Sequence, residues 1–124
     1  MAGPFPYLAG FGRPAPACPL TVGWQNNTTV VPALLDSGAD TTTIPAAIVG
    51  SLALLKISDV QVSGAIGPAE SHGMYVVDLD FLGLSHRNHP VVALPGRDYA
   101  LIGRDLMNQY TMTLRGPSVD YLIT

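Results

Sequence analysis

The chain has 124 residues, enough for one domain and too few for two. Hydrophobic residues make up 48% and charged residues only 12%, against about 25% charged in ordinary domains, and this balance excludes intrinsic disorder. The six Lys and Arg form no basic cluster and are outnumbered by nine Asp and Glu, so no nucleic-acid partner is expected. No apolar run approaches the roughly 18–20 residues that cross a bilayer, so no membrane partner is expected either. The excess of apolar surface predicts a subunit interface.

The N-terminal segment and the single cysteine bear on location and on covalent chemistry. The first residues lack a basic n-region and carry prolines through the apolar stretch, which is not the pattern of a signal peptide. A cytoplasmic location is therefore expected, unless the domain is excised from a longer precursor. Cys18, the only cysteine, excludes an intramolecular disulfide and a cysteine-cluster metal site.

In chain order, residues 1–19 are predicted to form a Pro- and Gly-rich arm ahead of a single domain at 20–124, because repeated Pro denies the backbone helix and ladder hydrogen bonds. Strands are expected at 20–24 and 28–35 around an Asn-containing turn, followed by a short helix over 45–54 that begins near Pro45. Further strands are expected at 60–66, from about 70 to 81, and at 89–94, 101–102, 112–114 and 119–123, with a second helix at 104–110.

The strand beginning near Glu70 gives the clearest periodicity. Tyr75, Val77, Leu79 and Phe81 alternate with polar residues, which is the pattern of a strand with one buried face. Many short strands, few helices and frequent turn residues predict an all-β barrel or sandwich.

The segment LLDSGADT, residues 34–41, is the first motif that carries chemistry. Asp36 directly follows an apolar strand and is followed by Ser37, Gly38, Ala39 and a second acid, Asp40. Alone, this pattern is also that of a common turn, in which Asp accepts backbone N–H bonds and Gly takes a positive φ.

Two further segments remove much of that ambiguity. ALIGRDLM at residues 100–107 follows about sixty residues later, and VSGAIGP at 62–68 lies between the two as a small-residue hairpin tip. In this order and spacing the three segments resemble the retropepsin family of aspartic proteases, over roughly residues 18–114. The ending YTMTLRGP at 110–117 is more similar to the bacterial and cellular branch than to the viral enzymes.

The resemblance implies a small closed barrel with one or two short helices that functions as a two-fold homodimer. In this family two aspartates share one proton, one activating a water molecule and the other donating to the peptide carbonyl. Since the chain has a single Asp-Ser-Gly, each subunit is expected to supply one Asp36, and the partner of the chain is a second copy of itself.

The same resemblance implies roles for the neighbouring residues. Asp36 would be catalytic, with Ser37 bonding across the two-fold axis and the Gly38 amide bonding the Asp36 carboxylate. Arg104 would pair with Asp40, and Asp105 would cap the following helix; both support the site. Substrate-binding residues would come from the motif loop, from a flap and from the strand before Gly103: Ala39, Asp40, Gly64, Ala65, Ile66, Tyr99 and Leu101. Ala65 and Pro68 stand where the best-known viral flaps carry glycine, so the resemblance does not predict how this flap moves.

Apolar pocket walls predict a peptide or protein substrate cut at hydrophobic or aromatic residues, although Leu34 and Leu101 fit a core role equally well. No cofactor is expected, and no metal. His86 and His89 have the spacing of a metal pair on a helix, but in a strand they would face opposite ways, so both are expected to be solvated.

Three functions compete at this stage. The first is an aspartic endopeptidase. The second is a non-catalytic dimerisation or peptide-binding module with the same fold, which would not need both the Asp-Ser-Gly-Ala-Asp and the Gly-Arg-Asp segments. The third, an Asp-based phosphoryl-transfer enzyme or metal hydrolase, lacks a Lys or a second acid cluster near Asp36.

Overall fold

The computed structural model describes residues 2–63 and 67–124. The chain is mostly β, with two short α-helices and one 3₁₀ turn. The elements in order are β1 Ala2–Pro6, β2 Ala17–Trp24, β3 Asn27–Leu35, β4 Thr43–Pro45, α1 Ala47–Ser51, β5 Lys56–Val62, β6 Glu70–Phe81, β7 Leu84–Leu94, β8 Ala100–Ile102, α2 Arg104–Met107, β9 Met112–Arg115, the 3₁₀ turn η1 Gly116–Ser118 and β10 Asp120–Ile123.

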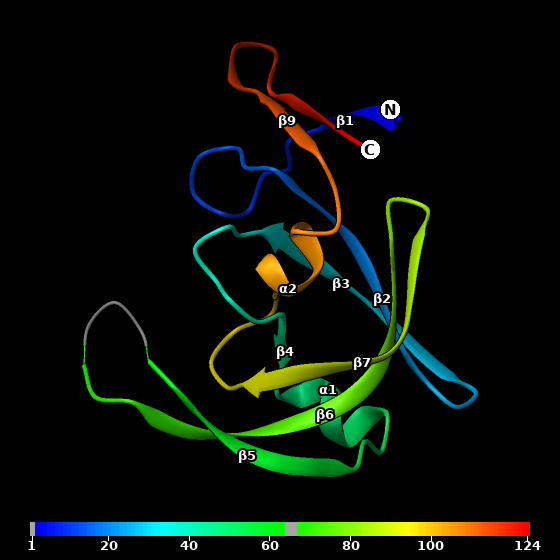
Figure 1. The fold of residues 1–124 in the computed structure, drawn as a ribbon, viewed down its shortest axis with the longest axis vertical. Helices are drawn as coiled ribbons and strands as arrows, with labels where there is room; N and C mark the ends of the chain where they lie inside the picture. The colour runs from blue at the N-terminus through cyan, green and yellow to red at the C-terminus, as the bar shows by residue number, and fades with distance from the viewer. Residues whose placement is uncertain (1, 64–66) are drawn as a thin grey trace.

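Six strands close into a barrel, and β5 extends the sheet beyond it (Figure 1). The hydrogen-bonded order is β2-β3-β8-β4-β7-β6-β5, and an additional pairing of β2 with β6 closes the ring. Two parallel contacts, β3 with β8 and β4 with β7, place β8 between the two ends of the 36–42 loop. Closure leaves few unpaired strand edges in the barrel.

The barrel core is built from the inward residues of alternating strands. Val77, Leu79 and Phe81 of β6 are buried, as their period-2 spacing predicts, and Tyr75 packs against the same core from its edge. Leu20 and Val22 of β2 meet this face across the β2–β6 pairing, and Leu106 of α2 is also fully buried. The burial of α2 against the barrel brings the Gly103–Asp105 segment next to the end of β3.

A second, three-stranded sheet in the order β1-β10-β9 lies at one end of the barrel, where the two termini meet (Figure 1). The prediction that prolines keep residues 1–19 out of ladders is wrong for two segments: β1 pairs with β10, and β2 already begins at Ala17. Pro4 and Pro6 are tolerated because β1 is an edge strand, where a missing N–H breaks no internal ladder.

Tyr121 of β10 connects this terminal sheet to the barrel. Its ring is fully buried and packs near Phe5 and Tyr7, and its hydroxyl donates to the Ala17 carbonyl at 2.8 Å. Cys18 lies beside it, and burial raises the pKa of the Cys18 thiol to about 12. The thiol is therefore a protonated core side chain.

Several predicted boundaries shift in the structure. The segment predicted to begin a helix at Pro45 first forms β4 alongside β7, and α1 is confined to Ala47–Ser51. The strand expected at 60–66 is β5, which lies four residues earlier, and the second helix ends at Met107 instead of residue 110. The expectation of short helices around a small β-barrel is confirmed.

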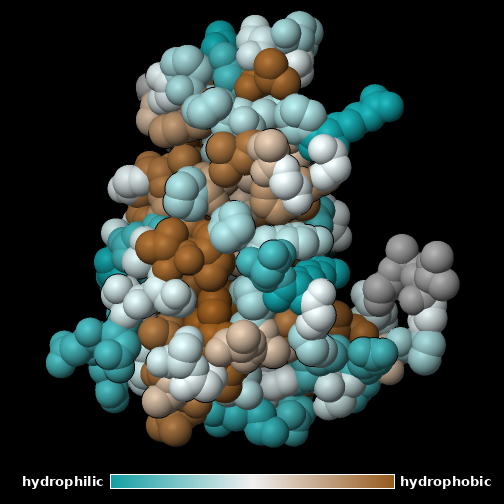
Figure 2. All heavy atoms as spheres, turned by 180° about the vertical axis from the view of Figure 1, so that it is seen from behind, coloured by the Kyte–Doolittle hydropathy of each residue, from teal (hydrophilic) through white to brown (hydrophobic). Residues whose placement is uncertain are grey.

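The surface keeps a share of apolar side chains. Figure 2 shows apolar atoms reaching the surface through the middle of the face opposite to that in Figure 1. The exposed large hydrophobic residues among those described are Val30, Leu55, Ile57, Leu114 and Val119. Among the helices of residues 2–63 and 67–124, none is long and apolar enough to cross a membrane.

Candidate active site

The loop that carries Asp36 is held at both ends by backbone hydrogen bonds to the segment around Gly103. The Asp36 N–H donates to the Ile102 carbonyl at 2.9 Å, which extends the parallel β3–β8 ladder by one step. The Arg104 N–H donates to the Ala39 carbonyl at 2.8 Å, and the Ala39 N–H closes a turn on the Asp36 carbonyl at 3.2 Å. The two sequence motifs therefore form one unit in space.

The Asp36 carboxylate is oriented from within this loop. The Gly38 N–H donates to Asp36 Oδ1 at 2.8 Å, and a Cβ at position 38 would lie 3.1 Å from the same oxygen. Asp36 is half-buried, while Ser37 and Gly38 are exposed. The predicted Gly38–Asp36 bond is thus present within a single chain, and the Ser37 side chain is accessible from outside it.

Asp36 opens onto a hollow of about 640 Å³, here called the active-site hollow. One side is the motif loop, and the other sides are β5, the end of β7 and β8. The lining residues are Asp36, Gly38, Ala39, Asp40, Thr41, Thr43, Val60, Gln61, Val62, Ser63, Val92, Leu94, Arg97, Leu101 and Arg104. The hollow combines two carboxyl groups, Asp36 and Asp40, and two guanidinium groups, Arg97 and Arg104, with apolar valine and leucine side chains.

The predicted substrate-binding residues divide into three groups. Ala39, Asp40 and Leu101 line the hollow. Tyr99 is absent from the described lining and packs instead edge-on against Phe11 of the N-terminal arm, at a ring-centroid distance of 5.2 Å. The predicted flap residues Gly64, Ala65 and Ile66 lie outside the described residues.

Arg104 takes a different partner from the one predicted. Its Nη1 donates to the Ser37 carbonyl at 2.8 Å, and the ion pairs of the described residues include none between Arg104 and Asp40. The guanidinium therefore fixes the backbone next to Asp36 and leaves Asp40 exposed in the hollow.

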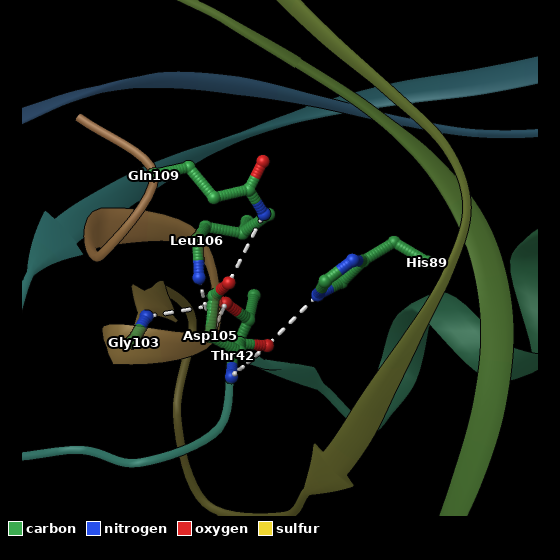
Figure 3. A network of polar contacts seen from close by, with 6 residues as sticks. All are labelled: Thr42, His89, Gly103, Asp105, Leu106 and Gln109. Carbon is green, nitrogen blue, oxygen red and sulfur yellow. Dashed lines mark hydrogen bonds and ion pairs between the residues drawn. The ribbon is translucent and has the colours of Figure 1, made fainter.

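Asp105 supports the loop through Thr42 instead of capping α2. The residue that precedes the helix is Gly103, which makes no side-chain cap, while Asp105 stands in the first turn and accepts from the Leu106 N–H at 3.0 Å. Its carboxylate also accepts from the Thr42 hydroxyl at 2.8 Å and from the Thr42 N–H at 3.1 Å. The same hydroxyl accepts the Gly103 N–H at 3.1 Å (Figure 3).

Burial alone would raise the pKa of the Asp105 carboxyl, but the hydrogen bonds from His89 and Thr42 outweigh it and hold the pKa below its usual range. Asp105 consequently remains an ionised acceptor into the acid range. The hydroxyl of the fully buried Thr42 links this carboxylate to the Gly103 N–H.

The prediction that His86 and His89 are solvated is wrong, and a β-bulge is the reason. Val77 of β6 pairs with His89 and Leu79 pairs with His86, so three steps along β7 oppose two along β6. The extra residue restores one facing direction to both histidines, with Asn88 at a φ of 52° and their rings 6.2 Å apart. His89 reaches Asp105 at 2.8 Å, and His86 shares a 2.6 Å hydrogen bond with the Tyr110 hydroxyl.

Thr42 and His89 support the Asp36 loop and were not predicted from the sequence; nor were several residues that line the hollow, among them Val60 and Val92. Thr42 sits in a run of three threonines, in which no pattern distinguishes the buried one. The spacing of His86 and His89 in the sequence indicates a possible pair. The bulge that turns both side chains to one face of β7 cannot be recognised from the sequence. Among the described residues, no three His, Cys, Asp or Glu side chains gather as a metal site would require.

Comparisons with known proteins agree with this arrangement. A family model described as "Aspartyl protease" matches residues 19–106, from near the start of β2 into α2. The chain belongs to the aspartyl protease family. The resemblance predicted from the three motifs is therefore confirmed, and the matched region contains every element that forms the active-site hollow. No protein with a curated description matches the chain significantly in sequence.

Solved structures give the fold. EIAV protease in complex with the inhibitor HBY-793 is 21% identical at a TM-score of 0.55, and the match covers 82% of this chain and 93% of that one. The retroviral protease-like domain of Ddi1 from Leishmania major is 12% identical at a TM-score of 0.54, with 89% and 94% covered. A foamy viral protease-reverse transcriptase bound to an RNA/DNA hybrid is 21% identical at a TM-score of 0.60 over 78% of this chain, which spans only 12% of the viral polypeptide. The barrel is therefore of the retropepsin type.

Proposed function

We propose that this protein is an aspartic endopeptidase that acts as a homodimer, each subunit contributing one Asp36 to a shared pair of carboxylates. The observation that carries the proposal is the Asp36 carboxylate at the end of β3, oriented by the Gly38 amide and open to a hollow of peptide-binding size. The protease family supports the reaction class.

The chemistry explains why one Asp36 is insufficient. Peptide hydrolysis needs a base that takes a proton from water and an acid that donates to the carbonyl oxygen at the same moment. Two adjacent carboxylates cannot both ionise cheaply, so one keeps the proton and becomes the acid while the other acts as the base. Water then adds to the carbonyl carbon, and the C–N bond breaks as the leaving amine takes up a proton. A two-fold axis beside Asp36 would supply the second carboxyl from the partner's Asp36.

The terminal sheet supports a contact between two copies. Its edge strands β1 and β9 have no further strand beside them within the described chain, so each exposes unpaired backbone groups. Leu114 on β9 is 57% exposed, and Val119 beside the same sheet is 48% exposed. A contact between two copies at this sheet would bury part of the apolar surface that the composition leaves in excess.

The walls of the hollow support a preference for hydrophobic or aromatic residues at the cleaved bond. Val62, Leu94 and Leu101 contribute apolar surface to the same hollow as Asp36 and Asp40. Burying a large apolar side chain there would contribute about 1.5–3 kcal/mol, while Asp40 is placed to accept from the peptide backbone of a substrate.

The test measures cleavage and assembly together. The purified chain is incubated with a mixed peptide pool between about pH 3 and pH 7, products are identified by mass spectrometry, and sedimentation equilibrium gives the dimer fraction over the same chain concentrations. Activity per chain should rise in proportion to the dimer fraction. Undiminished activity in a purely monomeric sample would contradict the shared carboxylate pair. Peptide binding without cleavage by the dimer would favour the non-catalytic binding module.

A further inference from the structure

The Asp105 carboxylate is the centre of a polar network that joins three elements of the fold (Figure 3). Two of them, the end of the motif loop at Thr42 and the first turn of α2, already border the candidate active site. The third is β7, which contributes His89 from the opposite side. Figure 3 shows the imidazole of His89 pointing across the gap toward Asp105 and Thr42.

Nε2 of His89 lies 2.8 Å from Oδ2 of Asp105. The two side chains are only 16% and 23% exposed, so water screens the pair less than it would on an open surface. An ionised carboxylate only accepts hydrogen bonds, so the Nε2 atom facing Asp105 must carry the proton. This requirement holds whether the imidazole is neutral or charged.

We propose that His89 is a positioning residue for Asp36: by donating from Nε2 to Asp105 it keeps that carboxylate aligned on Thr42, which in turn holds Gly103 and the loop carrying Asp36. The inference rests on the proposed function, since it assigns His89 a part in the reaction ascribed to Asp36. The chain of contacts runs from His89 to Asp105 at 2.8 Å, from Asp105 to the Thr42 hydroxyl at 2.8 Å, and from that hydroxyl to the Gly103 N–H at 3.1 Å.

The other titratable groups near His89 have partners of their own. His86 on the same strand bonds Tyr110, which follows α2, and stacks on Phe81. Burial, and then the neighbouring His89, hold the pKa of His86 below its usual range. Asp80 of β6 pairs with Arg87 at the surface. Asp105 is thus the carboxylate that His89 serves.

The pH dependence follows from the direction of the Asp105 shift. A carboxyl whose folded pKa is lowered contributes stability that is present above its ordinary value of about 4 and is lost as the pH falls through the lowered value. Removing the His89 donor moves the folded value upward, so the loop should loosen at a higher pH. Without the His89 donor, peptide cleavage should therefore be lost, as the pH falls, at a higher pH than in the wild-type protein.

Three variants test this proposal: His89→Leu, which removes the donor; His89→Leu combined with Asp105→Asn, which also removes the unpaired charge; and His86→Leu as the matched control from the same strand. For His89→Leu we expect kcat to fall about 10-fold to 100-fold, KM to change less, and the acidic limb of the pH profile to move to higher pH. The added Asp105→Asn should not restore kcat, because an amide has one accepting oxygen and cannot take both Thr42 donors. It should abolish the shift of the acidic limb, because the titrating carboxyl is gone. His86→Leu should leave the acidic limb in place.

A measurement without substrate separates this inference from the proposed function. In ¹H–¹⁵N spectra, His89→Leu should shift the amide signals of Thr42, Gly103 and Gly38, whereas His86→Leu should leave the Gly38 signal unmoved. Full activity and an unchanged acidic limb in His89→Leu would overturn the inference while leaving the protease proposal intact. A wild-type chain that cleaves nothing would overturn the protease proposal, and the spectra would still decide whether His89 positions the loop. An unshifted Gly38 signal in His89→Leu would reject that coupling.

Discussion

Replacing Asp36 with Asn should reduce peptide cleavage by at least about 100-fold at every pH. The amide keeps the size of the carboxyl and can still accept the Gly38 N–H at the position of Oδ1, so the loop should keep its shape. It cannot take a proton from water at any accessible pH, and both chemical roles in the pair depend on a carboxyl group. The loss should appear in kcat with little change in KM, because the walls of the hollow are untouched.

Asp59→Asn is the matched control for this variant. Asp59 lies on the exposed strand β5, where its contact is a surface ion pair with Lys56 at 3.1 Å. An exposed pair of this kind contributes little to stability, so the control should keep wild-type activity. Equal activity in Asp36→Asn and Asp59→Asn would contradict the assignment of Asp36.

Adding a single methyl group at Gly103 should disrupt both the fold and the site. A Cβ there would lie 2.8 Å from the Thr41 carbonyl carbon and 2.9 Å from the Ala39 carbonyl oxygen, and both are backbone atoms of the Asp36 loop. Backbone cannot turn aside as a flexible side chain can. Gly103→Ala should therefore lower the free energy of unfolding by about 1–3 kcal/mol and displace the loop, with a loss of kcat. The φ of Gly103 is −92°, so steric contact alone is the cause.

Gly50→Ala provides a control of opposite sign. Gly50 lies inside α1, where a Cβ would meet no atom within 4 Å. Since Gly is destabilising in a helix, this change should raise the free energy of unfolding by about 0.5–1 kcal/mol. Denaturant titration of both variants measures the two effects. A Gly103→Ala protein that unfolds at the wild-type midpoint would show that the close approach is not real.

The two sequence motifs lie together around Asp36 in the structure, whereas the partners of Arg104 and Asp105 and several strand boundaries differ from the prediction. Asp36, Gly38 and Gly103 are recognisable because a tight loop that aims a carboxylate needs those residue types at fixed spacing. The edge strand β1 was hidden because Pro4 and Pro6 argue against a strand unless its free edge is known in advance. That knowledge comes only from the pairing with β10, more than a hundred residues away.

Long-range pairing also explains the other errors. Pro45 is an acceptable first residue for a helix, but its segment lies beside the end of β7 and so forms a strand first. His89 faces Asp105 only because β7 has one residue more than β6 across the bulge at Asn88. Local propensity contains no information about such a mismatch between two strands, and the network behind Asp36 depends on it.

Mixing two kinds of chain tests most directly whether the active unit uses one Asp36 from each of two copies. Wild-type and Asp36→Asn chains are combined in equal amounts and allowed to exchange subunits. The activity of the mixture is compared with that of wild-type protein alone at the same total chain concentration. If cleavage needs both carboxyls, only dimers of two wild-type chains are active, and random pairing leaves about one quarter of the activity. A residual activity of about one half would mean that each Asp36 works on its own, and would contradict the shared pair.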